Sequence, residues 1–597
     1  MKFQISRGKF IKISSVAMAG AIMSDLAIAG STVFNDKTKI DDQLMKKLIL
    51  HNDIRVKRIL DEEQVKDENY QSSFRRLAVI VSCVSGSLCN SDSEYYKSQK
   101  LINILEKVLD IMLSAQYSDG TLDSGGNRQS PPDTGFILEH LCSASVVLNR
   151  LEFQNLLQTK NKLEKFIKNA AVAMVTGGVH TPNHRWVICS ALAQINELYP
   201  DTKYVERIDE WLAEGIYINE DGHFPERSGN YSAVIDRTLM TMSRLLNRPE
   251  LLDPVRKNLT TYYFYTEPNG DLVSIDSRRQ DQWYTSTITK FYLQYRQLAI
   301  NDNDGMFASI AKTIESLPDF ENEILSNSLI YFMENPDLQK TLPPLVKAPD
   351  DFEKFFKLAN LARIRHGSTS VTIFGGNDKP VIVSSGRSSN PDFLTFRKGM
   401  SMLKYMRLST SFFRMGYFRG DGLSNEGQKY TLTETKEAYY YQPMSKELRK
   451  TDGDYELSQS IDRRFWNKMD FDSREKSNIK KLDTIIEITE KDGTLNLDFK
   501  VDGPPNVAVT IEMCFNEGGK LVNTEKHGED NYLLKSGFGE YIVGDDKITF
   551  GPGKNEHQRI TRLESEQYSY HQGSLRTEGV HVYLTGHTPF RHKMTIG

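Results

Sequence analysis

The sequence has few cysteines and no excess of charge of either sign. Its 5 cysteines are an odd number, so at least one is free or pairs with another chain, and no C-x-x-C pattern indicates zinc. Cys83 and Cys89 either form a local bridge or are two small apolar residues buried in a helical layer. Lys+Arg (75) nearly balance Asp+Glu (79), and the net charge of -4 disfavours nucleic acid or an anionic membrane as a partner of the whole surface.

Long apolar runs are also missing. Beyond the first thirty or so residues, no run reaches the roughly 18 to 20 apolar residues that a membrane span needs. Residues 1–29 have the pattern of a signal peptide, with Lys2, Arg7, Lys9 and Lys12, then a mostly small or apolar stretch, then Ala27-Ile28-Ala29. We therefore expect cleavage near Ala29 and a periplasmic or secreted protein.

Metal-ligand patterns are scarce as well. The histidines of the C-terminal part show no tight ligand spacing; they are His527, His557, His571, His581, His587 and His592. We expect neither a metal nor another cofactor.

What the sequence does contain is a change of hydrophobic period near residue 340. From about Ile40 to Phe332, apolar residues recur at spacings of three and four, which predicts about a dozen helices joined by short turns. The proline-rich segment 341–349 breaks this pattern. Alternation at period two then predicts strands near 370–374, 381–383, 394–396, 484–488, 495–499, 508–514, 541–543 and 581–584, with Asp492-Gly493 as a hairpin turn.

These patterns predict an α+β multidomain protein. The expected order is a signal peptide (1–29), an (α/α) toroid that is the catalytic domain (30–340), a linker (341–355) and an antiparallel β-sandwich (356–597). The lack of strict sequence repeats disfavours a solenoid or a propeller but allows a toroid of diverged helical pairs.

Polar groups with catalytic potential gather at the starts of two predicted helices. Thr181 suits an N-cap and Pro182 the first helical position, so Asn183 and His184 are expected in the first turn. Free backbone N–H groups there attract an anion, and the positive end of the helix dipole favours a neutral His184.

The second helix start lies in the segment Asp221–Tyr231. Ser228 is expected to cap a helix that carries Tyr231 in its first turn. A phenol with a reference pKa of about 10 is a poor base unless cations or helix-end N–H groups stabilise its phenolate. The candidates for this role, or for gripping a substrate carboxylate, are Arg185, Arg227, Arg237, Arg278 and Arg279.

Asn183-His184 followed by D-G-x-F-x-E-x-S-x-x-Y at 221–231 resembles the pattern of heparinase II/III-type and alginate-type polysaccharide lyases. Those enzymes also have a helical domain followed by a β-sandwich. The resemblance implies that Asn183 and His184 neutralise a uronate carboxylate and assist proton transfer, and that Tyr231 is the acid or base. It further implies a sandwich histidine in the same cleft, for which His366 is the candidate, and an acidic polysaccharide or oligosaccharide as substrate.

Two positions depart from the common pattern of these lyases. Arg227 stands where many relatives have a small residue, and Ser232 where a histidine is common, which disfavours a heparin substrate. The chain as a whole looks most like the rhamnosyl-glucuronate lyases (polysaccharide lyase family 27). Those enzymes remove terminal L-rhamnose from α-1,4-linked D-glucuronate in arabinogalactan. An alginate- or heparan-type uronate lyase remains an alternative.

Two functions of other classes also remain open. A glycoside hydrolase acting on acidic glycans would need a pair of carboxylates about 5 to 9.5 Å apart, for which Asp133, Asp221 and Glu226 are available. Asp133 also fits a turn that leads into a helix at 136–151, Glu226 fits a scaffold acid, and both are candidates for substrate binding. A non-catalytic glycan-binding protein could stack sugars on Tyr439-Tyr440-Tyr441, although packing at a strand edge explains these residues as well.

Overall fold

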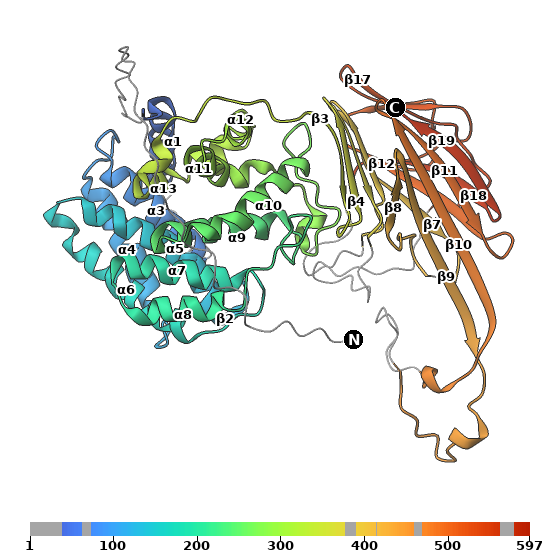
Figure 1. Ribbon diagram of the computed structural model, residues 1–597, viewed down its shortest axis with the longest axis horizontal. Coiled ribbons are helices and arrows are strands. Elements are labelled where there is room, and N and C mark those ends of the chain that lie inside the picture. Colours follow the sequence, from blue (N-terminus) through green and yellow to red (C-terminus); the bar gives the residue numbers. More distant parts are fainter. Residues whose placement is uncertain (1–38, 62–72, 377–389, 414, 459–468, 561–577) are drawn as a thin grey trace, which may run out of the picture. The chain divides into compact units, whose positions relative to one another are not determined.

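The computed structural model describes residues 39–61, 73–376, 390–413, 415–458, 469–560 and 578–597. The predicted signal peptide and the predicted strand at 381–383 lie outside these residues. Within them the chain is α+β, with α-helices up to Glu334 and mostly strands from Asp351 onward, apart from one short hairpin among the helices (Figure 1). The predicted linker therefore contains the start of the first sandwich strand.

The helical part is a ring of helical pairs. α3, α5, α7 and α9 contact one another in turn, α11 contacts α9, and α13 contacts α3 and α5. The bounds are α1 Asp42–Asp61, α3 Phe74–Cys89, α4 Gln99–Ala115, α5 Pro131–Arg150, α6 Leu157–Thr176, α7 His184–Leu198, α8 Thr202–Leu212, α9 Gly229–Leu246, α10 Leu252–Phe264, α11 Tyr292–Asn301, α12 Gly305–Ile314 and α13 Leu329–Glu334. This arrangement is the predicted (α/α) toroid.

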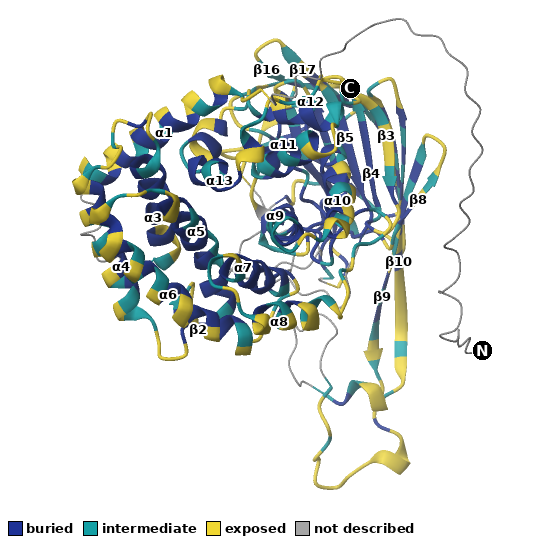
Figure 2. Ribbon diagram, turned by 60° about the vertical axis from the view of Figure 1, so that its left-hand side comes forward, coloured by how far each residue is buried: buried dark blue, intermediate teal, exposed yellow. Residues whose placement is uncertain are grey.

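Burial separates the inner helices of the toroid from the outer ones (Figure 2). α3 and α5 are buried along most of their length, whereas α8 buries only Tyr204 and Ile208. An outer helix needs only one apolar stripe, with apolar residues three or four positions apart, because one face is buried. An inner helix is packed on several sides and is apolar over more of its surface. All 5 cysteines are free, and Cys83 is buried in α3 as a small apolar residue. No described helix is long and apolar enough to cross a membrane.

The C-terminal part consists of two facing sheets with the strand orders β13-β16-β17-β19-β11-β10-β9-β8 and β14-β15-β18-β12-β7-β6-β5-β4-β3. Neighbouring strands are antiparallel except β15 and β18. The bounds are β3 Asp351–Phe356, β4 Leu361–His366, β5 Thr369–Phe374, β6 Leu394–Lys398, β7 Ser401–Thr410, β8 Leu423–Glu426, β9 Lys429–Tyr441, β10 Lys476–Lys491, β11 Thr494–Asp502, β12 Ala508–Phe515, β13 Lys520–Val522, β14 Glu525–Lys526, β15 Asn531–Leu533, β16 Gly539–Val543, β17 Asp546–Gly551, β18 Val580–His587 and β19 Phe590–Ile596.

The hairpin predicted at Asp492-Gly493 is confirmed, because Lys491 pairs with Thr494 across that turn. Because side chains alternate along a strand, neighbouring residues lie in two different environments. In β4, Ile364 joins the core between the sheets, while its neighbour Arg363 points to the opposite face and contacts the toroid.

Glu267, just after α10, joins the toroid to the sandwich. Its carboxylate lies 2.8 Å from Arg363 Nη1 of β4 and 3.4 Å from Arg397 Nε of β6, and it accepts a hydrogen bond from Ser370. Arg363 is fully buried and Glu267 is 4% exposed. An unpaired charge at such a depth is costly, so each group depends on the other.

Replacing Glu267 should therefore destabilise the protein strongly. We expect Glu267→Gln to lower the free energy of unfolding by about 3 kcal/mol or more, because it leaves Arg363 buried without its counter-charge. Chemical denaturation measures this change. The matched control is Glu214→Gln, since the side chain of Glu214 is 51% exposed and pairs with Arg185 on the surface. The control should cost less than about 1 kcal/mol. Equal effects of the two substitutions would contradict this account of Glu267.

Candidate active site

The first predicted helix start lies two residues later than the sequence indicates. α7 begins at His184, and Asn183 takes the N-cap position in place of Thr181. The Asn183 side chain does not cap the helix. Its Nδ2 donates to Glu226 Oε2 at 2.8 Å instead, and the residue is fully buried. The Asn183 Oδ1, which would accept the capping hydrogen bond, has no hydrogen-bond partner among the described residues.

His184 is a nearly buried imidazole at the start of α7, 8% exposed. Its ring meets the ring of His180 edge-on, with centroids 4.8 Å apart, and lies 6.0 Å from that of Phe136. Burial, helped by the neighbouring His180, lowers the pKa of His184 to about 4. The imidazole is therefore neutral at pH 7, as the sequence predicts, and a neutral imidazole can accept a proton.

The segment 221–231 is anchored at its first residue. Asp221 Oδ2 accepts hydrogen bonds from the backbone N–H groups of Leu358 (2.7 Å) and Ala359 (3.0 Å), in the turn between β3 and β4. Gly222 has a φ of +87°, and a Cβ at this position would lie 2.1 Å from Thr261 Oγ1. Only glycine fits there. The Asp221 carboxylate, a candidate for hydrolytic chemistry, is thus engaged in holding the segment.

Tyr231 lies in the first turn of α9, as predicted. Ser228 caps this helix, its Oγ accepting a hydrogen bond from the Tyr231 backbone N–H at 3.3 Å. The phenol oxygen accepts hydrogen bonds from Arg279 Nη2 (3.0 Å) and Gln280 Nε2 (2.9 Å). The Arg279 guanidinium carbon also lies 4.2 Å from the centre of the Tyr231 ring, in a cation–π arrangement. Both donors point at the atom that carries the negative charge of a phenolate.

Glu226 connects the two helix starts. One carboxylate oxygen accepts from Asn183 and the other from Arg279, which in turn donates to Tyr231. The residue is 6% exposed. Burial raises the pKa of Glu226, and the hydrogen bond from Asn183 and the charge of Arg279 oppose that rise. A continuous series of hydrogen bonds thus links the Asn183 amide, the Glu226 carboxylate, the Arg279 guanidinium and the Tyr231 phenol.

The other arginines predicted for the site have different surroundings. Arg185 pairs with Glu214 at 2.7 Å. Arg278 is exposed and donates to the Pro225 carbonyl at 3.2 Å. Arg227 is 8% exposed, with a φ of +44°, and its charge acts on the buried Asp276, whose pKa burial raises to about 6 while Arg227 opposes the rise. Of the five candidates, Arg279 is the one that contacts Tyr231 among the described residues.

Asp133 is held by its own helix start. It lies in the first turn of α5, which begins at Pro131, so it is not in a turn before the helix as predicted. Its carboxylate accepts hydrogen bonds from Ser130 Oγ (2.7 Å) and Asn127 Nδ2 (2.9 Å), and it forms an ion pair with Arg75. Arg75 also stacks on Phe136, which contacts His184. Asp133 therefore supports the surroundings of His184 indirectly.

His366 lies at the end of β4 between two carboxylates of the sandwich. Its Nδ1 is 2.9 Å from Asp351 Oδ1 and its Nε2 is 3.2 Å from Glu490 Oε1. No contact links it to Tyr231 or His184 within the described residues. Gln280, by contrast, was not predicted, although it directly follows the Arg278-Arg279 pair and donates to Tyr231. Nothing in the sequence distinguishes it from other polar loop residues.

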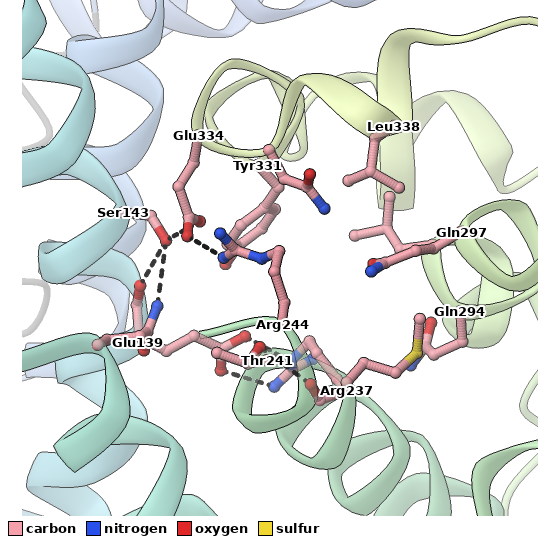
Figure 3. Close-up of a pocket in the computed structure, with 14 residues that line it drawn as sticks. Glu139, Ser143, Arg237, Thr241, Arg244, Gln294, Gln297, Tyr331, Glu334 and Leu338 are labelled. Atoms are coloured by element: carbon pink, nitrogen blue, oxygen red, sulfur yellow. Dashed lines mark hydrogen bonds and ion pairs between the residues drawn. The ribbon is translucent and has the colours of Figure 1, made fainter. Parts of the chain in front are cut away.

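A separate cavity of about 60 Å³ lies among the inner helices of the toroid (Figure 3). Arg237 pairs there with Glu139 (Nη2 to Oε2, 2.8 Å), and Arg244 pairs with Glu334. These contacts remove Arg237 from the set of Tyr231 partners. In the described stretches, no group of three or more histidine, cysteine, aspartate or glutamate side chains could hold a metal ion.

No protein-family model matches the sequence, and no curated protein matches it. Three solved structures of similar fold are a heparinase and two lyases by name. Heparinase III has a TM-score of 0.51 at 13% identity, over 96% of this chain and 85% of that chain. The chondroitin AC lyase of Streptomyces coelicolor A3, in complex with chondroitin sulphate, has a TM-score of 0.51 at 11% identity, over 92% of this chain and 79% of that chain. A Paenibacillus xanthan lyase has a TM-score of 0.52 at 10% identity, over 93% of this chain but only 55% of that chain. The chain therefore has the toroid-plus-sandwich fold of polysaccharide lyases.

A second buried histidine lies beneath the site. His223 is 1% exposed, and its ring centroid is 4.8 Å from that of Tyr265 and 6.1 Å from that of Phe356 of β3. Neither ring nitrogen has a hydrogen-bond partner among the described residues. Burial, with a smaller contribution from the charge of Arg227, lowers the pKa of His223 to about 3.

His223 should make the protein sensitive to acid. Because its folded-state pKa is about 3 and its unfolded value about 6.5, its stabilising contribution is complete above pH 6.5 and declines as the pH falls toward 3. When the pH falls from 7.5 to 5.0, the free energy of unfolding should decrease in both proteins. We expect this decrease to be about 2 kcal/mol smaller in His223→Phe than in the parent protein. Denaturant titrations at the two pH values measure this. The same acid sensitivity in both proteins would show that His223 is not the cause.

Proposed function

We propose that this protein is a polysaccharide lyase that cleaves the bond at C4 of a uronic acid by β-elimination. The observation that carries the proposal is the Tyr231 phenol, held by Arg279 and Gln280 at the start of α9. The similarity of the fold to heparinase III, chondroitin AC lyase and xanthan lyase supports it. So does the neutral, nearly buried His184 at the neighbouring helix start.

The chemistry requires stabilisation of an enolate. The hydrogen on C5 of a uronic acid can be removed only if the growing charge on the carboxylate meets donors already in place. The donors proposed for this are the N-terminal N–H groups of α7 and the further N–H groups of Asn183 and Arg279, each of which also donates to Glu226. A base then takes the C5 proton, and an acid protonates the oxygen that leaves C4.

Tyr231 can perform both proton transfers on a glucuronate. In that sugar the C5 hydrogen and the C4 oxygen lie on the same face of the ring, so the elimination is syn and one phenol can serve as base and then as acid. On the C5 epimer the two groups lie on opposite faces, and His184 becomes the better base. Glu226 keeps Asn183 and Arg279 in place by accepting a hydrogen bond from each.

A glycoside hydrolase needs two carboxyl groups that face a common substrate. The three candidates are engaged elsewhere: Asp133 with Arg75, Asp221 with the turn after β3, and Glu226 with Asn183 and Arg279. These contacts favour the lyase over the hydrolase. A protein that only binds glycans would not need a phenol held by two donors beside a neutral imidazole.

The finer proposal is an exo-acting enzyme that removes terminal L-rhamnose from α-1,4-linked D-glucuronate in arabinogalactan, working in the periplasm or outside the cell. The resemblance of the sequence to rhamnosyl-glucuronate lyases motivates it. Alginate- and heparan-type uronate lyases are the alternatives within the same reaction.

Tyr231→Phe tests the reaction. We expect it to lower kcat about 100- to 10,000-fold, because it removes the proton that the phenol transfers. The conjugated double bond of the product is followed by its ultraviolet absorbance, which a hydrolase would not generate. Tyr217→Phe is the control, since Tyr217 is 61% exposed and outside the site, and it should keep parental activity. A folded Tyr231→Phe protein with near-parental activity would exclude Tyr231 as the proton carrier.

A substrate panel tests the finer proposal. With rhamnose-capped arabinogalactan we expect free rhamnose and an unsaturated uronate left on the polymer. Alginate and heparan are assayed in parallel for unsaturated products. Turnover of either of these, with no release of rhamnose from arabinogalactan, would refute the finer proposal while leaving the elimination reaction in place.

A further inference from the structure

An exposed aromatic ring lies at the start of α9, the helix that carries Tyr231. Tyr284 directly follows the 3₁₀ turn Gln280–Trp283, the same turn whose Gln280 donates to Tyr231. The residue is 43% exposed. Its hydroxyl accepts a hydrogen bond from Asn230, the residue before Tyr231. One short turn thus positions both a partner of Tyr231 and an open aromatic surface.

Asn230 fixes the orientation of Tyr284. Its Nδ2 donates to the Tyr284 hydroxyl, while its Oδ1 accepts from Lys290 Nζ. Since an ammonium group can only donate, the Lys290 contact also determines which way the amide points. Asn230 directly precedes Tyr231 in α9, and successive helical side chains diverge by about 100°. Tyr284 and Asn230 therefore border a different side of the same helix start from Tyr231.

The charges of Lys290 and Asp281, which lie near Tyr284, are directed inward. The Lys290 ammonium is bonded to Asn230, and burial lowers its pKa against the pull of Asp281, Glu323 and Asp319. Asp281 is 1% exposed and accepts hydrogen bonds from Ser228 and Ser277. Of these groups, the ones left to meet a ligand are an aromatic face, a hydroxyl and an amide. Such a surface suits the C–H face and hydroxyl groups of an uncharged sugar.

Asn183 and Arg279, by contrast, are hydrogen-bond donors suited to a sugar that carries a carboxylate. We propose that Tyr284, oriented by Asn230 and Lys290, forms the subsite for an uncharged sugar joined to O4 of the uronate, and that stacking on its ring selects that sugar over a uronate or a sulphated residue. This inference rests on the proposed elimination at Tyr231. It makes Tyr284 a specificity-determining residue and assigns it no proton transfer.

Two substitutions separate the ring of Tyr284 from its hydroxyl. Tyr284→Ala removes the stacking surface, and we expect KM for a rhamnosyl-glucuronate substrate to rise about tenfold with kcat changed less than about threefold. Tyr284→Phe keeps the ring, so KM should stay within about threefold of the parental value. Tyr217→Ala removes another exposed tyrosine, 61% exposed, elsewhere in the toroid and should leave KM unchanged. Circular dichroism and thermal melts confirm that each variant is folded, and Tyr284→Leu replaces the alanine variant if that one is not.

Binding without turnover provides a second measurement. In a Tyr231→Phe background, calorimetric titration with the same rhamnosyl-glucuronate oligosaccharide should show about tenfold weaker binding once Tyr284→Ala is added. A matched oligosaccharide with a uronate in place of the rhamnose should bind more weakly than the neutral one and respond little to Tyr284→Ala.

The outcomes distinguish this subsite from the reaction itself. Unchanged KM and Kd in Tyr284→Ala, or tighter binding of the uronate-substituted oligosaccharide, would overturn the subsite even if the lyase is active. Loss of binding in Tyr284→Ala without any unsaturated product from the parent protein would support the subsite and refute the elimination.

Discussion

The candidate site depends on one buried carboxylate, that of Glu226. It accepts a hydrogen bond from Asn183 at the start of α7 and pairs with Arg279 from the loop after α10, while its own segment leads into α9. Burial of a carboxylate is unfavourable unless donors surround it, so the three segments stabilise one another through this group. Removal of Arg279 would leave the Glu226 carboxylate without its counter-charge, and removal of Asn183 would leave one of its oxygens without a donor. The positions of the phenol and of the amide are in this way set by a residue that need not touch the substrate.

Local signals in the sequence were sufficient for much of the architecture. The spacing of apolar residues predicted the helices and the strands, Asp492-Gly493 predicted a hairpin, and Ser228 predicted the cap of α9. Each of these depends on residues within a few positions of one another. The start of α7 was predicted too early, at Thr181, and the Asn183 amide at the actual N-cap bonds to Glu226, 43 residues away, and not to its own helix.

Side-chain partners across long separations could not be predicted. Five arginines were equivalent candidates in the sequence, and only the fold shows that Arg279 contacts Tyr231 while Arg237 and Arg185 pair with Glu139 and Glu214. The same holds for His366, whose carboxylate neighbours come from β3 and β10. TM-scores of 0.51 and 0.52 to solved structures show a common fold at only 10–13% identity, so the chemistry of this chain must be argued from its own residues.

The contact of Asp221 with the turn at Leu358 and Ala359 bears on how the protein can be divided. Phe356, Leu361 and Phe374, from three strands of the sandwich, belong to the same apolar cluster as the helices of the toroid. A fragment that ended near residue 340 would therefore lose part of its own hydrophobic core along with the anchor of the segment that leads to Tyr231. The two halves differ in secondary structure, yet they share one apolar cluster, and a cut at the boundary between them would expose it.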